Sequence, residues 1–354
     1  MKITFWWRQT SGYFDACTRA LVNAGHEVSV VYEAPTAEAP FMSVSERGFD
    51  HLADVRFWSG QPTRSLLAGT LNGATDLLVV SSWGVGKYVR ESAAAPSSTL
   101  RLVGVDSPWR SSPRPIVGQF THRRRLAGAF DGAWVTGAPQ RQLVRRLGFR
   151  TAEIIEHLYC CDSHLFSPRH SAKMRFDLPF LFVGRLVDVK GLRPLGKAFQ
   201  LFRQSTGSTR RLQIVGNGAI DVRGEGIDVL PFAEPPEVKA LMDNSFALVH
   251  PAFLEHWGVV VHEAASMGLP LILGPSVHSG SRLLFDGING FYADPEVEGL
   301  AKAMTALDQL KFESYERMSK ASEHLGHLLN LESWTENLER GVDQLRRTKE
   351  ESRI

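Results

Sequence analysis

Residues Ala247–Gly274 read ALVHPAFLEHWGVVVHEAASMGLPLILG, and this stretch decides the fold. An apolar run ends at His250, a loop follows, and apolar residues at helical spacing then extend to Met267. Gly268 and Pro270 end this helix, because glycine readily takes the left-handed conformation after a helix and proline cannot continue one. A second apolar run follows at once. The stretch therefore predicts a strand, a helix and a second strand parallel to the first.

The same alternation of short apolar runs and helical patterns extends outward from this stretch in both directions. In the first half it predicts strands at Lys2–Trp6, Glu27–Tyr32, Asp54–Trp58, Leu77–Ser81, Leu100–Val105, Ala133–Thr136 and Glu153–His157. The pattern then restarts, with strands predicted at Phe180–Gly184, Arg211–Val215, Ile227–Leu230, Ala247–His250 and Leu271–Gly274. Strands separated by helices indicate parallel βαβ units, so we expect two open, doubly wound α/β sheets in series. Ligands of such sheets bind outside the carboxyl ends of the strands.

Three parts are expected along the chain. Residues 1–165 form a first Rossmann-like domain and residues 166–332 a second one, joined by a polar segment that contains Pro168 and ends before Pro179. Past Pro295 the pattern predicts helices alone. The last helix, residues 333–354, begins near Ser333 as SWTENLERGVDQLRR and has no strand of its own.

The composition is that of a globular protein and names no charged partner. The chain has 354 residues, 43% of them hydrophobic and 22% charged, enough for two α/β domains. Lys and Arg number 40 against 38 Asp and Glu, and a net charge of +2 lies far below that of a typical nucleic-acid-binding domain. Cys17, Cys160 and Cys161 form no C-x-x-C pair, which excludes a disulfide framework and the common zinc spacings. With no recognisable signal peptide or membrane-spanning run, we expect a cytoplasmic protein.

Two glutamates flank the start of the helix in the opening stretch. Glu255 lies in the loop before it, and Glu263 lies in its second turn, eight positions later. The free N–H groups and positive dipole end of a helix start attract a diphosphate. A glutamate in the first turns could accept hydrogen bonds from two vicinal hydroxyls of a ribose. Taken alone, however, such a pair is more often two solvated surface residues.

Two cations follow the first strand of the second domain. In FLFVGRLVDVKGL, residues Phe180–Leu192, Arg185 comes after the strand and a glycine, and Lys190 precedes the next helix. A cation pair at the carboxyl end of a strand is well placed for phosphate oxygens, the guanidinium as a fork and the ammonium as a point charge. Solvated surface charges are an equally good interpretation of this segment alone.

Together these segments resemble the family-4 retaining glycosyltransferases. FVGRL…KG, LQIVGNG, the E-x7-E stretch and DGINGFYADP occur in the order of that family's motifs, and DSHLFSP resembles its interdomain segment. The likeness covers residues ~130–345 well and the earlier part in topology alone. It implies an α/β protein of the GT-B fold, with two Rossmann-like, doubly wound domains facing each other across a cleft. It also implies that the C-terminal helix crosses back to the N-terminal domain.

The resemblance implies a role for each matching residue. Arg185 and Lys190 would neutralise the diphosphate of a nucleotide-sugar donor, Glu255 would face the transferred sugar, and Glu263 would hold the ribose. Phe232 would lie beside the base, Gly216 and Gly218 would allow close approach, and Gly258, Val259 and Val260 would supply backbone donors. The other expected donor-binding residues are Gly12, Gly184, His256 and Trp257.

The chain also departs from the family pattern. Relatives often carry a double-glycine loop after the first strand, and here RQTSGYF has Gly12 alone. Relatives often present a histidine on the acceptor side. The candidates for an acceptor-side residue here are Asp106 and His122, either of which is more often a structural residue. No D-x-D sequence occurs, so we expect neither a metal nor a cofactor.

The expected enzyme is a hexosyltransferase-like, retaining, metal-independent transferase whose acceptor is a glycan, a lipid-linked sugar or a small molecule. Three alternatives stay open: a nucleotide-sugar epimerase, a glycosyl phosphorylase and a non-catalytic protein that binds sugar nucleotides. A basic surface is a further expectation, because HRRR ends at Arg125 and a helix carries Arg141, Arg145, Arg146 and Arg150. Such surfaces can contact anionic bilayers, which would place the protein at the inner membrane face, although a solvated basic face is the commoner case.

Overall fold

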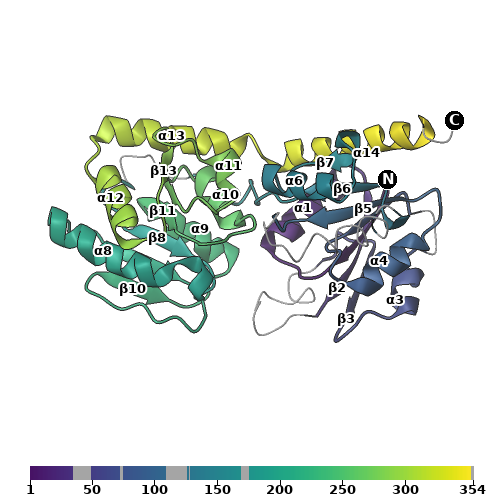
Figure 1. Ribbon diagram of the computed structural model, residues 1–354, viewed down its shortest axis with the longest axis horizontal. Helices are drawn as coiled ribbons and strands as arrows, with labels where there is room; N and C mark the ends of the chain where they lie inside the picture. Colours follow the sequence, from purple (N-terminus) through teal and green to yellow (C-terminus); the bar gives the residue numbers. More distant parts are fainter. Residues whose placement is uncertain (35–48, 72–74, 109–125, 127, 169–174, 352–354) are drawn as a thin grey trace. The chain divides into compact units, whose positions relative to one another are not determined.

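The computed structural model describes residues 1–34, 49–71, 75–108, 126, 128–168 and 175–351 (Figure 1). Its contacts divide the chain into two compact units. The first unit comprises Met1–Cys160 together with Leu331–Ile354, and the second comprises Cys161–Asn330. Both divisions fall a few residues before the boundaries expected from the sequence, and the C-terminal helix is counted with the first unit.

The first unit contains a seven-stranded parallel sheet in the order β3-β2-β1-β4-β5-β6-β7. Its strands are β1 (Lys2–Trp7), β2 (Glu27–Glu33), β3 (Asp54–Trp58), β4 (Leu77–Val80), β5 (Leu100–Val105), β6 (Gly132–Val135) and β7 (Ile154–Ile155). Its helices are α1 (Gly12–Asn23), α3 (Arg64–Gly69), α4 (Gly86–Ala93), α6 (Ala138–Arg146), the short 3-10 helix η1 (Thr151–Glu153) and α14 (Leu331–Glu351). All seven strands expected in this half are present.

The central strands of this sheet are buried on both faces. In β1 every residue after Lys2 is buried, and all four residues of β4 and of β6 are buried. Such continuous apolar strands are typical of parallel sheets covered by helices on both sides.

The C-terminal helix α14 completes the core of the first unit. Its buried residues include Trp334, Leu338, Val342 and Leu345, which recur at helical spacing and form one apolar stripe. The Trp334 ring stacks on Trp134 of β6 with the ring centroids 5.2 Å apart, and its indole N–H points to the carbonyl oxygen of Leu158 at 3.4 Å. Aromatic pairs of this kind add about 1 kcal/mol beyond the area that they bury.

The second unit contains a six-stranded parallel sheet in the order β10-β9-β8-β11-β12-β13. Its strands are β8 (Phe180–Val183), β9 (Leu212–Val215), β10 (Ile227–Leu230), β11 (Ala247–His250), β12 (Leu271–Leu273) and β13 (Gly290–Tyr292). Its helices are η2 (Asp188–Lys190), α8 (Leu192–Thr206), α9 (Pro235–Asp243), α10 (Val259–Ser266), α11 (Gly280–Leu283), α12 (Val297–Asp308) and α13 (Phe312–His327).

One strand of the second unit was not expected. β13 lies in DGINGFYADP, which was predicted from the sequence to be a loop. The strand pairs with β12 at the edge of the sheet. Three residues are too few to give a periodic signal, so the prediction of five strands was one short. Asn289 supports the turn before β13 by accepting a hydrogen bond from the backbone N–H of Phe285 at 2.8 Å.

Successive residues of β8 point to opposite faces of the second sheet and build two cores. Phe180 and Phe182 pack in one cluster with Leu195 and Phe199 of α8, whereas Leu181 packs with residues of α9 and α10 in the other. The sheet is therefore covered on both faces. This burial fixes the register of the strands and so places their carboxyl ends along one edge.

Candidate functional site

The expected donor-site residues of the second unit come from segments that leave the carboxyl edge of its sheet. β8 leads into Gly184 and Arg185, β9 into Gly216, and β11 into the loop that carries Glu255. This loop is held from both sides. The backbone N–H of Phe253 donates to the carbonyl of Val189, and that of Glu255 donates to the carbonyl of Ser276 at 3.0 Å.

Glu255 lies at the centre of a compact polar network. Its Oε2 atom accepts hydrogen bonds from Nζ of Lys190 and from Nε2 of His250, the latter at 3.1 Å. Lys190 is buried, Glu255 is largely buried, and His250 is 1% exposed. The imidazole of His250 also stacks on Phe182, with the ring centroids 5.3 Å apart and the planes within 5° of each other.

The network holds Glu255 in its ionised form. Burial alone would raise the pKa of the Glu255 carboxyl, but the hydrogen bond from His250 and the nearby ammonium of Lys190 outweigh it and hold this pKa far below its usual range. Burial lowers the pKa of His250, more than its hydrogen bond to Glu255 raises it. His250 is therefore a neutral donor, and Lys190 balances the charge of Glu255.

Helix α10 begins beside Glu255. Its N-cap is Gly258, whose φ of 82° lies in the left-handed region that favours glycine. A Cβ atom at this position would approach Cγ of Glu255 to 2.9 Å. The first N–H groups of the helix, on Val259 and Val260, have no acceptor one turn earlier within the helix, so they are available to an anion.

Glu263 lies in the second turn of α10 in a different environment. It is half-buried, and its side chain makes no hydrogen bond or ion pair among the described residues. Burial raises the pKa of its carboxyl to about 8, and the neighbouring Cys161 and Asp162 act in the same direction. The Cys161 backbone N–H donates to Nδ1 of His262 at 3.2 Å, which ties this segment to the helix.

The two expected phosphate-binding cations, Lys190 and Arg185, have different environments. Lys190 is buried and has its own anionic partner, Glu255. Arg185 is exposed, and its side chain makes no hydrogen bond or ion pair with the residues that the structure describes. A lysine ammonium has three donors, so the contact with Glu255 leaves Lys190 able to bind an additional acceptor.

The G-N-G segment after β9 packs closely against the segment after β8. Gly216 and Gly218 have φ of 145° and 158°, and a Cβ on either would lie about 2 Å from the carbonyl oxygen of Gly184 or Leu186. Asn217 between them was not singled out from the sequence. Its Oδ1 accepts a hydrogen bond from the backbone N–H of Phe232 at 3.1 Å, so it positions the residue expected beside the base.

The side chains of His256 and Trp257 differ in exposure. Trp257 is 2% exposed, and its indole N–H is buried without an acceptor among the described residues. Its side chain therefore belongs to the core, and its carbonyl oxygen accepts the N–H of Ser279 at 3.3 Å. His256 is half-buried and lies near His278, whose pKa is lowered by burial and then by His256.

In the first unit, Asp106 follows the carboxyl end of β5. Its Oδ2 atom accepts a hydrogen bond from the hydroxyl of Tyr159 at 3.2 Å. The rings of Tyr159 and Tyr13 lie 5.1 Å apart, and Tyr13 is next to Gly12, the first residue of α1. Tyr13 and Tyr159 were not expected from the sequence. His122, the other acceptor-side candidate, lies outside the described residues.

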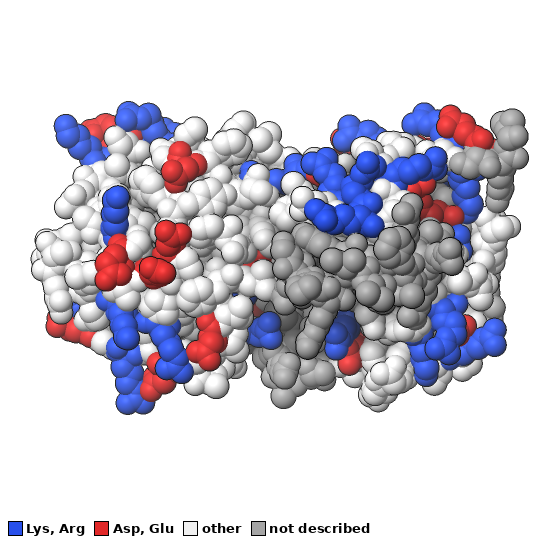
Figure 2. Space-filling model, viewed as in Figure 1, with Lys and Arg blue, Asp and Glu red and all other residues white. Residues whose placement is uncertain are grey.

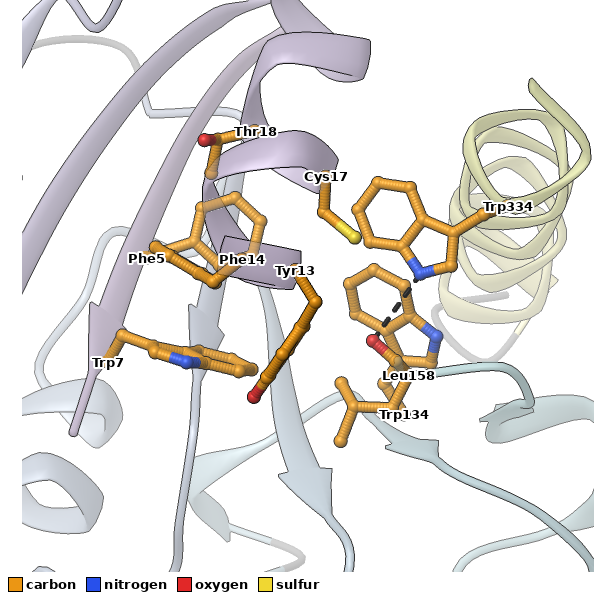
Figure 3. A pocket seen from close by; sticks show the side chains of 9 residues that line it. All are labelled: Phe5, Trp7, Tyr13, Phe14, Cys17, Thr18, Trp134, Leu158 and Trp334. Atoms are coloured by element: carbon orange, nitrogen blue, oxygen red, sulfur yellow. Dashed lines mark hydrogen bonds between the residues drawn. The ribbon is translucent and has the colours of Figure 1, made fainter. Parts of the chain in front are cut away.

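A small pocket in the first unit is lined mostly by aromatic side chains, Tyr13 among them (Figure 3). Its lining residues are Phe5, Trp7, Tyr13, Phe14, Cys17, Thr18, Trp134, Leu158 and Trp334. The space inside is that of about one water molecule. The pocket is therefore a packing defect of the core and not a substrate site.

The structure adds two observations on metals and membranes. Among the described residues no group of three or more His, Cys, Asp or Glu side chains is arranged to hold a metal ion. None of the described helices is both long and apolar enough to span a bilayer.

Figure 2 shows several Lys and Arg side chains near the position that α6 has in Figure 1. On α6, Arg141 pairs with Glu156 at 2.9 Å, and Arg145 and Arg146 are exposed.

Known proteins share both the sequence pattern and the fold. Residues 177–325 match the family model of the glycosyl transferases group 1. The D-inositol 3-phosphate glycosyltransferase of Pseudarthrobacter chlorophenolicus is 32% identical over 244 residues, which are 63% of this chain and 57% of that protein. The chain thus spans little more than half the length of this curated relative.

Solved structures match nearly the whole chain. A glycosyltransferase from Rickettsia africae has a TM-score of 0.75 at 13% identity, over 97% of this chain and 98% of that one. Anabaena HepE in complex with UDP has a TM-score of 0.75 at 16% identity, over 97% of this chain and 100% of that one. These matches confirm the expected fold class: an α/β protein of the GT-B type with two parallel sheets and a C-terminal helix.

Proposed function

We propose that this chain is a retaining glycosyltransferase that moves a sugar from a nucleotide diphosphate donor to an acceptor hydroxyl. One observation carries the proposal: an ionised Glu255, held by Lys190 and His250, lies beside the start of a helix that carries Glu263 in its second turn. The match to the glycosyl transferases group 1 and the activity in the name of the curated relative support it.

The donor diphosphate would bind at the start of α10. Its oxygens would accept hydrogen bonds from the N–H groups of Val259 and Val260, from the remaining donors of Lys190 and from the guanidinium group of Arg185. The guanidinium of Arg185, the remaining N–H donors of Lys190 and the helix start would take the place of a metal, so we propose donor binding without one. HepE was solved with UDP and with UDP-glucose, which makes UDP-sugars the first donors to test.

The proposed reaction retains the configuration of the sugar. The acceptor oxygen forms a bond to the anomeric carbon on the face that the nucleotide diphosphate leaves, and the diphosphate departs with the electron pair of the broken bond. An oxygen of the leaving phosphate takes the acceptor proton. No side-chain nucleophile is needed, so the protein contributes positioning and electrostatic stabilisation.

On the acceptor side we propose Asp106, held by Tyr159, as a residue that binds the acceptor hydroxyl. The acceptor could be a glycan, a lipid-linked sugar or a small molecule, and Asp106 is suited to all three because a carboxylate accepts hydrogen bonds from any hydroxyl. The exposed arginines of α6 would favour an acceptor at an anionic surface.

A panel of nucleotide diphosphates and their sugars, screened by thermal shift, tests the donor. A ligand at a hundredfold excess over its Kd stabilises the folded protein by about 2.7 kcal/mol. The preferred donor should therefore raise the melting temperature clearly. Transfer of a labelled sugar from that donor to water or to an acceptor, with retention of its anomeric configuration by NMR, would support the full proposal. Binding of no member of the panel would reject it.

The same labelled donor separates the three alternatives. A sugar-nucleotide-binding protein without activity would bind the donor and leave it intact. An epimerase would convert the donor into its epimer without releasing the nucleotide. A glycosyl phosphorylase would instead release a sugar 1-phosphate from a glycan in the presence of inorganic phosphate.

A further inference from the structure

His250 is an unusual residue for its position. It ends β11, where the three preceding residues are apolar and buried, and it is itself 1% exposed. Burying a polar ring costs free energy unless its nitrogens are hydrogen-bonded. Its ring faces Phe182 on one side, and the charged groups next to it are Glu255 and Lys190. The partner that compensates the burial of His250 is Glu255.

The single ring hydrogen bond of His250 indicates its tautomer. Nε2 lies 3.1 Å from a carboxylate oxygen of Glu255, and Nδ1 is buried without a partner among the described residues. The proton of the neutral ring therefore sits on Nε2. A second proton on Nδ1 would be buried without an acceptor, which agrees with the lowering of the His250 pKa by burial.

Both contacts to Glu255 fall on the same oxygen. Lys190 and His250 donate to Oε2, and no described residue donates to Oε1. The carboxylate is thus held at one oxygen and open at the other. A glutamate side chain that is already fixed loses less rotamer freedom when a ligand binds, and this improves recognition by the open oxygen.

We propose that His250 is a positioning residue that aims Oε1 of Glu255 at the hydroxyls of the donor sugar. The inference rests on the proposed function, because it needs a sugar nucleotide as ligand. His250 itself contacts no substrate in this proposal; it acts through Glu255. It follows that changes at His250 alter affinity for the sugar part of the donor and spare affinity for the nucleotide part.

The test compares two substitutions of similar size. His250→Gln keeps an N–H donor near the position of Nε2, whereas His250→Phe keeps a flat ring against Phe182 and removes the donor. UDP and UDP-glucose are titrated calorimetrically into the wild type and both variants, or the matching pair of another base if the panel selects one. The measured quantity is the ratio of the two affinities, and UDP binding also reports that the second unit is folded.

We expect His250→Phe to lower the affinity for UDP-glucose relative to UDP by about tenfold, because the lost hydrogen bond involves a charged group. His250→Gln should restore most of this ratio. In a Glu255→Gln background, His250→Phe should add little further loss, since the two residues act as one unit.

The other outcomes overturn the inference. Equal ratios in the wild type and His250→Phe would mean that His250 does not position Glu255. Equal losses in both variants would assign His250 a packing role alone. If His250→Phe does not bind UDP, the pair His250→Gln and His250→Asn replaces it, because the shorter amide cannot reach Oε2. A wild type that binds neither UDP nor any sugar nucleotide would instead reject the proposed function itself.

Discussion

Glu255 and Glu263 are eight positions apart at the start of one helix, yet their pKa values are shifted in opposite directions. Glu255 has a cation and a neutral donor on one oxygen, which keep it ionised, whereas burial raises the pKa of Glu263 to about 8. The same residue type thus has two different states near neutral pH. This difference predicts that the two residues contribute differently to binding and to catalysis.

Replacing each glutamate by glutamine should leave a different kinetic signature. Glu263→Gln should raise the KM for the donor with a modest change in kcat, because the ribose does not change during transfer. Glu255→Gln should lower kcat by roughly 100-fold, because its charge faces the sugar as positive charge develops there, and it should also weaken binding of the sugar part of the donor. Steady-state kinetics at saturating acceptor measure both. Wild-type kinetics in both variants would show that neither glutamate lies in the donor site.

The raised pKa of Glu263 predicts a pH dependence of stability. Between about pH 4.5 and 8 the folded carboxyl holds a proton that the unfolded one has lost, so its contribution to stability falls as the pH rises through this window. Glu263→Gln lacks this penalty. The variant should unfold at nearly the wild-type temperature at pH 5 and at a higher temperature than the wild type at pH 8.5. A constant difference across this range would contradict the environment described for Glu263.

Donor binding should not require a divalent cation. Lys190 has donors left after its contact with Glu255, and Arg185 is exposed beside the same strand end. The Kd for UDP-glucose, or for the donor that the panel selects, should be the same in excess chelator and in millimolar Mg²⁺ or Mn²⁺. Binding that disappears with chelator and returns with the metal would show that a cation takes part.

The last helix should contribute strongly to the stability of the first unit. Trp334 is 4% exposed and stacks on Trp134. Trp334→Ala should therefore lower the free energy of unfolding by roughly 3–5 kcal/mol. Trp334→Phe keeps an aromatic ring there and should cost less. Glu336→Ala, an exposed change on the same helix, is the matched control and should shift the unfolding midpoint little. Equal midpoints in all four proteins would mean that α14 is not needed for this core.

The basic face of α6 gives a prediction about membranes. Arg145 and Arg146 are exposed, and each cation near an anionic surface contributes about 1 kcal/mol. The protein should sediment with phosphatidylserine vesicles at low salt and remain in the supernatant with phosphatidylcholine vesicles. The double variant Arg145→Glu, Arg146→Glu should lose this difference. Equal recovery of the wild type with both vesicles would leave these arginines as a solvated face.

The sequence predicted the elements with strong periodicity and the residues of the ordered motifs. It located α10 to within a residue, because Gly268 and Pro270 mark its end and apolar spacing marks its length. It missed β13, whose three residues give no period, and it missed the partner of Glu255. Nothing in VHPAFLE shows that the loop turns the glutamate back onto His250 five positions earlier, since that contact depends on the packing of the loop against η2.

The acceptor side was harder to predict for a related reason. Asp106 was named as a candidate, but its partner Tyr159 lies fifty-three positions away, and no local pattern joins them. Hydrogen bonds between residues this far apart are set by the order of strands in the sheet, which follows from tertiary packing.

Because α14 belongs to the first unit, the two units cannot complete their folding in the order in which they are synthesised. Cys161–Asn330 is one uninterrupted segment, whereas the apolar stripe of Trp334, Leu338 and Val342 is synthesised after all of it. The second unit can therefore acquire its native packing while the first still exposes the surface around Trp134. We expect the nascent first unit to depend on chaperones until the final helix emerges, although its strands are made first.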